Sequence, residues 1–64
     1  MRYFNVTLQI ENAVVEATVK VKSLNRKEII EGVNFHHPSL NLLRAVIIHL
    51  YEFKDEEEAS NFLL

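Results

Sequence analysis

Residues 4–21 read FNVTLQIENAVVEATVKV, and this stretch decides the fold. In each half, apolar residues alternate with mostly polar ones. This period of two predicts two strands, each with one buried and one solvated face. Residues 11–12 separate the halves, and Asn12 tolerates the positive φ of a tight hairpin turn. A two-residue loop gives the register Phe4–Val19, Val6–Ala17, Leu8–Val15 and Ile10–Ala13. Every pair is apolar, so the pattern and the turn length agree on one β-hairpin.

Composition limits the chain to one small unit. Its 64 residues contain no cysteine, so no disulfide supports the core. Residues 1–64 are therefore expected to form a single small α+β domain, for which oligomerisation is a common source of extra buried area. No run of 18 apolar residues occurs, and Arg2 leads directly into a strand pattern. Neither a membrane span nor a signal peptide is expected, and the expected location is cytoplasmic.

The periodicity changes after the hairpin. Asn25 followed by Glu28 is a capping-box arrangement, and it predicts a helix that begins at Arg26. Gly32 is the only glycine in the chain and is placed where a helix would end. We therefore expect a short helix over Arg26–Glu31 on the apolar face of the hairpin. Residues 34–41 contain turn formers and are expected to form a loop.

Residues 42–53 allow two interpretations. They are rich in β-branched residues, which favours a strand. With Ser39 as a cap, residues 40–53 also have helical spacing, which would give a ββαα order. Asp55 and Glu58 form a second capping-box pattern with no Gly or Pro before it. A strand followed by a new helix suits that junction better than a break between two helices, so we favour the strand.

These elements predict an α+β fold with ββαβα order. A crossover through the first helix places the third strand beside the first. The expected sheet is three-stranded and antiparallel, with strand order 2-1-3 and two short helices on one face. In the second helix, the expected core-facing residues are Ala59, Phe62 and Leu63.

Motifs of catalysis and metal binding are missing from the sequence. There is no glycine-rich phosphate loop and no cysteine nucleophile. We therefore expect no enzymatic activity, no catalytic residues and no cofactor. His36, His37 and His49 are the histidines, and two adjacent loop residues plus a remote one do not have the spacing of a structural zinc site. No metal site is expected.

Nucleic-acid binding is the alternative function. Its candidate residues are Tyr3, Lys20, Lys22, Arg26 and Lys27. A ring beside lysines on a solvated sheet face resembles the surfaces that bind single strands. However, such surfaces usually stack two or three bases, and a net charge of −2 lacks the basic footprint of a nucleic-acid binder.

The third strand has more apolar residues than one buried face can use. In one register Ile47, His49, Tyr51 and Phe53 point away from the helices; in the other, Val46, Ile48 and Leu50 do. Either register leaves an apolar stripe on an edge strand. Exposed stripes and free edges of this kind are sites of association. We expect a partner or dimer interface formed by Ile47, His49, Tyr51 and Phe53.

The function expected from the sequence is therefore binding. The chain is predicted to be a small non-enzymatic protein–protein interaction module that binds a larger protein, as a homodimer. A cysteine-free chain of this size with one small α+β core is similar in format to the inhibitors and regulators that phages and mobile elements encode. The sequence identifies no particular partner.

Overall fold

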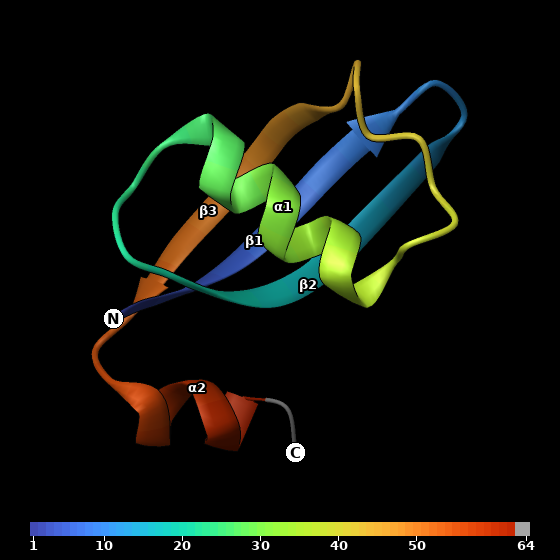
Figure 1. The fold of residues 1–64 in the computed structure, drawn as a ribbon. Helices are drawn as coiled ribbons and strands as arrows, with labels where there is room; N and C mark the ends of the chain where they lie inside the picture. The colour runs from blue at the N-terminus through green and yellow to red at the C-terminus, as the bar shows by residue number, and fades with distance from the viewer. Residues whose placement is uncertain (63–64) are drawn as a thin grey trace.

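The computed structural model describes residues 1–62. The elements follow the order β1 (Arg2–Ile10), β2 (Ala13–Val21), α1 (Arg26–His36), β3 (Val46–Phe53) and α2 (Glu56–Phe62). The three strands form one antiparallel sheet with the order β2-β1-β3 (Figure 1). The predicted ββαβα order and the 2-1-3 sheet are therefore confirmed, and the helical alternative for residues 40–53 is not the structure.

The hairpin has the predicted register. Phe4 lies opposite Val19, Leu8 opposite Val15 and Ile10 opposite Ala13. The turn differs from the expectation in one respect, because no residue in the described chain has a positive φ. The apolar pattern of the two strands sets the register, and the turn closes without the left-handed conformation that Asn12 could have adopted.

Helix α1 begins at the predicted capping box. The Asn25 side chain accepts a hydrogen bond from the Glu28 backbone N–H at 2.9 Å. The Glu28 carboxylate accepts hydrogen bonds from the Ser23 hydroxyl at 2.6 Å and from the Lys22 backbone N–H at 3.2 Å. These bonds favour the charged form, and they lower the pKa of Glu28 below its ordinary value. The cap therefore fixes both the start of α1 and the chain leading out of β2.

The predicted end of α1 is wrong. The helix continues through Gly32 to His36, so residues 34–36 are helical and not part of a loop. Gly32 has an ordinary helical conformation. Its lack of a side chain matters because a Cβ at this position would lie 2.9 Å from the Cβ of Val19. The glycine lets α1 approach β2 closely, and the helix ends before Pro38, whose ring disfavours the helical conformation in the preceding residue.

Strand β3 begins four residues later than predicted, at Val46 instead of Leu42. Residues 42–45 form an irregular connection, in which Leu42 and Ala45 are buried. The side chain of Asn41 accepts a hydrogen bond from the Leu43 backbone N–H at 3.0 Å, which turns the chain. The sequence pattern of residues 42–45 is strand-like because two of them pack into the core from a loop.

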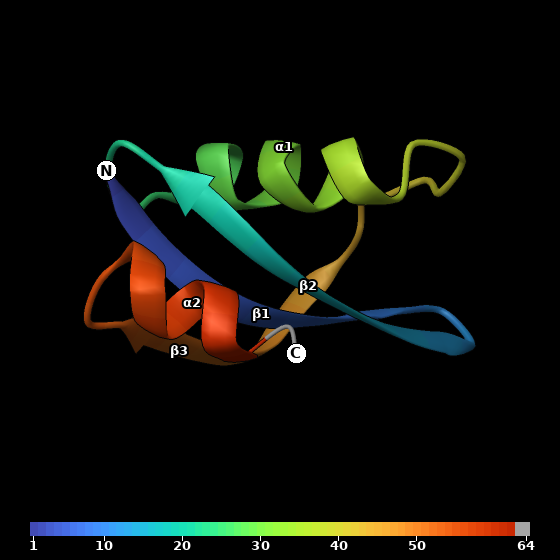
Figure 2. The same ribbon diagram turned by 90° about the horizontal axis from the view of Figure 1, so that it is seen from below.

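The two helices lie on opposite faces of the sheet, which corrects the expectation that they share one face (Figure 2). Phe53 pairs with Tyr3, so its ring lies on the face opposite Phe4 and α1. Only Lys54 and Asp55 separate β3 from α2, and the helix folds back over Phe53, whose ring centroid lies 5.2 Å from that of Phe62. An aromatic residue at the end of β3 therefore determines which face α2 covers. Of the predicted core residues of α2, Ala59 is buried and Phe62 is half exposed, whereas Leu63 lies outside the described residues.

The main core lies between the sheet and α1. Its fully buried side chains are Phe4, Val6, Leu8, Ile29 and Val33. Under α2 the packing is less complete. The amide nitrogen of Asn5 and the hydroxyl of Thr18, which are register partners, are buried without a hydrogen bond. None of the helices among residues 1–62 has the length and apolar character needed to cross a membrane.

Candidate functional site

Strand β3 is an edge of the sheet. It pairs with β1 on one side, and its other side faces outward. Eight residues long, it offers unpaired backbone N–H and C=O groups, which are a template for another strand. The segment from Val46 to Tyr51 contains no Lys, Arg, Asp, Glu or Pro, the residues that commonly protect such edges.

A β-bulge divides β3 into two parts. Thr7 lies opposite His49, and the next residue of β1, Leu8, lies opposite Ile47, so Ile48 has no partner in β1. Because side chains alternate between faces, the extra residue puts Ile47 on the α1 face together with Leu50. His49 and Tyr51 lie on the α2 face.

The four residues predicted as an interface do not form one surface. Phe53 is only 4% exposed beneath α2, and Ile47 is half buried on the opposite face. His49 and Tyr51 are exposed and lie on a common face. Two causes act together: the bulge changes the face on which Ile47 lies, and α2 covers Phe53.

An exposed apolar stripe is nevertheless present on β3. We call it the β3 apolar edge, and its residues and exposed fractions are Val46 (59%), Ile48 (51%), Leu50 (37%) and Tyr51 (50%). Val46, Ile48 and Leu50 belong to the second of the two predicted registers, and Tyr51 belongs to the first. The exposed residues therefore come from both predicted sets, and they line the strand edge on both faces of the sheet.

A groove lies beside the β3 apolar edge, between β3 and the start of α1. Its apolar lining includes Leu24, Ile29 and Leu50, and Leu24 is half exposed. Arg26 crosses one wall and donates a hydrogen bond to the Ala45 backbone carbonyl at 2.6 Å, which ties α1 to the chain before β3. Arg26 and Arg44 are the charged residues of the lining, so the groove is apolar with a basic margin. Nothing in the sequence pattern indicated this role for Leu24.

Opposite charges lie at the two ends of β3. Arg44 is exposed just before the strand, whereas an exposed Lys54 and then three exposed acidic residues, Asp55, Glu56 and Glu57, follow it. Within the strand, Glu52 pairs with Arg2 at 2.8 Å, and the hydrogen bonds from this guanidinium lower the pKa of Glu52. Glu52 is therefore neutralised by its own chain, while Arg44 and the acidic start of α2 face solvent.

The other edge of the sheet is protected. Glu16 and Lys20 are exposed along β2, and Nε2 of His37 lies 3.4 Å from the backbone carbonyl oxygen of Glu16. A charged strand with part of its edge covered is a poor template for pairing. This contrast distinguishes β3 as the open edge.

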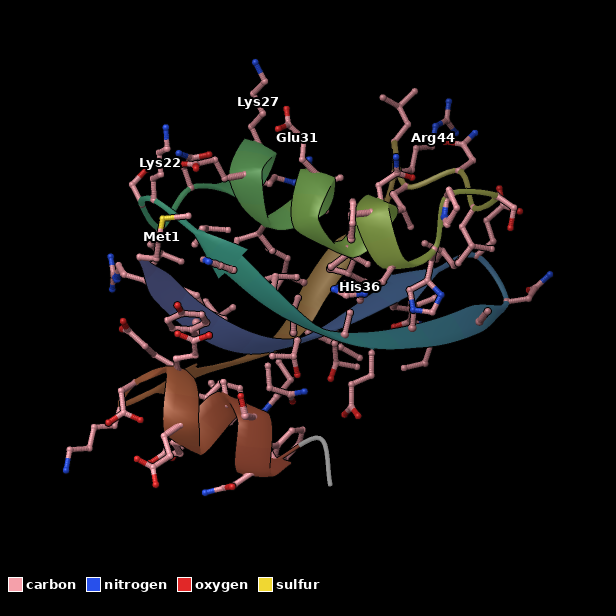
Figure 3. All side chains as sticks on the ribbon, turned by 60° about the horizontal axis from the view of Figure 1, so that its bottom comes forward. Met1, Lys22, Lys27, Glu31, His36 and Arg44 are labelled. Carbon is pink, nitrogen blue, oxygen red and sulfur yellow. The ribbon has the colours of Figure 1, made fainter. Side chains whose placement is uncertain are left out.

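The residues proposed for nucleic-acid binding are divided between two faces. Lys20 Nζ lies 5.9 Å from the centroid of the Tyr3 ring, and both residues are on the α2 face. Lys27 belongs to α1, on the other side of the sheet, and Figure 3 shows Lys22 and Lys27 projecting from that side. Arg26 is engaged with Ala45. The structure thus brings together two of the five residues.

The histidines are also dispersed. His36 is exposed at the end of α1 and packs edge-on against Phe35, with ring centroids 5.5 Å apart. His37 contacts β2, and His49 lies on β3. Residues 1–62 contain no group of three or more His, Asp or Glu side chains that could hold a metal ion.

Comparisons with protein-family models, with curated proteins and with solved structures find no match for this chain. The candidate site is therefore defined by its geometry: an open edge strand, an apolar stripe and a neighbouring groove.

Proposed function

We propose that this protein is a non-enzymatic protein–protein interaction module that forms a homodimer through β3 and binds a larger protein as an inhibitor or regulator. The observation that carries the proposal is the β3 apolar edge, four exposed apolar residues on a strand whose outer edge is unpaired. Strand addition to a free edge supplies backbone hydrogen bonds, and the exposed side chains supply apolar contact area. The groove beside α1 is the surface proposed for the larger partner.

The test of self-association is the solution mass, measured by light scattering over a dilution series. The wild-type chain is expected at twice its mass of 7.5 kDa. Ile48→Lys puts a charge into the β3 apolar edge and is expected to give a folded monomer. Val14→Lys is the matched control, because Val14 is 62% exposed on β2 and its change should leave the dimer intact. A monomer at every wild-type concentration, or equal disruption by both variants, would refute self-association through β3.

The larger partner requires a separate experiment. Leu24→Asp places a carboxylate in the groove, away from the β3 backbone. The experiment is a pull-down from a lysate of the source organism, with the wild-type chain and the Leu24→Asp variant as baits. The variant is expected to remain dimeric but not to retain a protein that the wild-type chain retains. Retention of the same protein by both baits would exclude the groove as the binding surface.

A further inference from the structure

We infer that two copies of β3 pair antiparallel, with a two-fold axis through Leu50, so that six strands form one continuous sheet. This inference rests on the proposed function and adds its geometry.

The face of each side chain restricts the register. Residues directly opposite each other in an antiparallel pair project on the same face of the sheet. A two-fold axis must then pass through a residue and cannot lie between two residues. Only His49, Leu50 and Tyr51 lie near the middle of the exposed part of β3 and are outside the bulge.

Leu50 is the one of these three whose two neighbours in the strand are neither the bulged residue nor a charged residue. With Leu50 on the axis, two Leu50 side chains meet on the α1 face, and each His49 lies opposite the Tyr51 of the other copy on the α2 face. An axis through His49 would place the bulged Ile48 in the first flanking pair, opposite Leu50. An axis through Tyr51 would place the charged Glu52 in the first flanking pair, opposite Leu50, whereas the Leu50 axis moves both Glu52 and Ile48 out to the second pair.

The charges select the antiparallel direction. In the Leu50 register, the exposed Arg44 of each copy lies near Asp55 and Glu56 of the other. A parallel pair would bring the two Arg44 side chains together at one end and the two acidic starts of α2 together at the other, so that like charges would meet. Such complementary charges contribute more to orientation than to affinity.

The accessible surface of the chain is larger than its mass alone predicts. The chain has 4690 Å² of accessible surface, whereas a folded monomer of its mass is expected to have about 4,250 Å². Pairing through β3 covers part of this excess. It also joins the two α1–β3 grooves, because both Leu50 side chains lie on the α1 face, and a single apolar trough results.

Cysteine cross-linking tests the axis directly, since the chain contains no cysteine. A disulfide requires Cα atoms about 4.4–6.8 Å apart, a distance that directly opposed residues satisfy. Leu50→Cys alone is expected to form a covalent dimer under mild oxidation. His49→Cys and Tyr51→Cys are expected to cross-link when mixed and much less when each is oxidised alone. Val14→Cys is the control for random collision.

The outcomes separate the inference from the proposed function. If light scattering shows a dimer but His49→Cys or Tyr51→Cys cross-links with itself in preference to the mixture, the Leu50 axis is wrong and association through β3 stands. If the chain is monomeric and no variant cross-links above the Val14→Cys control, the Leu50 axis and the proposed self-association both fail.

A charge reversal gives a second readout. Arg44→Glu should weaken the dimer several-fold at low salt, and adding Glu56→Arg should restore it. Failure of the double variant to recover would contradict the antiparallel arrangement.

Discussion

Replacing Gly32 with alanine should destabilise the protein, although alanine is the better helix former. Gly32 lies inside α1, where it faces β2. A Cβ added there would lie 2.9 Å from the Cβ of Val19 and 3.0 Å from its Cγ1. Rotation of the Val19 side chain moves Cγ1 but not Cβ, because the backbone of β2 fixes the position of Cβ.

The magnitude follows from two opposing effects. Replacing a glycine in a helix interior with alanine improves helix propensity by about 1 kcal/mol. A relaxed carbon–carbon contact is roughly 3.5–4.0 Å, so α1 must move by about half an ångström or more, carrying Ile29 and Val33 away from the core. Overpacking of this kind costs about 1–3 kcal/mol. We expect a net loss of about 1–2 kcal/mol in the free energy of unfolding, when the gaps opened around Ile29 and Val33 are included.

Thermal unfolding monitored by circular dichroism measures this effect. A loss of 1 kcal/mol lowers the Tm of a domain this small by about 4–8 °C. All variants should be compared at one chain concentration, because the proposed dimer would make the Tm concentration-dependent. Asn34→Ala is the matched control: Asn34 is exposed two residues further along α1, and its change should raise the Tm slightly through helix propensity alone. A Gly32→Ala variant as stable as the wild type would refute the close approach of α1 to β2.

Three further predictions concern single side chains. Asn25→Ala removes the cap of α1 and should lower the free energy of unfolding by about 1 kcal/mol, measured by urea denaturation. Glu28 and Glu52 have lowered pKa values in the folded chain, so the stability they provide is present above their ordinary value of 4.5 and is lost as the pH falls through the lower folded values. The Tm should therefore fall on acidification below pH 4.5, and less steeply in Glu28→Gln. Thr18→Val removes a buried hydroxyl without a hydrogen bond and should stabilise the protein by about 1 kcal/mol.

Each of these predictions has a result that contradicts it. An Asn25→Ala variant of wild-type stability would mean that α1 does not depend on its cap. Parallel Tm curves for wild type and Glu28→Gln would remove that carboxylate from the acid response. Destabilisation by Thr18→Val would show that the hydroxyl has a partner, such as a buried water.

The sequence predicted the parts of the fold whose patterns have one interpretation. The hairpin register follows from four apolar pairs, and the start of α1 follows from Asn25 and Glu28, whose spacing suits a cap and little else. The end of α1 was missed because a lone glycine fits both a helix end and a close contact between elements. Only the position of Val19 in space distinguishes these two roles of Gly32.

The sequence predicted which strand carries the candidate site, but not which of its side chains are exposed. An excess of apolar residues in β3 indicated an exposed stripe, and the stripe is present. Its members depend on the bulge at Ile48, and three consecutive β-branched residues give no sign of where a bulge falls. The face of the sheet that α2 covers depends in turn on the face to which Phe53 points. A shift of one residue in β3 would therefore move the helix to the other side of the sheet.

The unequal edges of the sheet have a consequence for the size of any assembly. A chain with two pairing edges can add copies at both ends and grow into a fibril. Here β2 carries Glu16 and Lys20 and has His37 against its backbone, which leaves β3 as the one open edge of the described sheet. Two copies joined at β3 present only protected strands at both outer ends. In the dimer that we propose, no open edge remains, so association is expected to end at two copies.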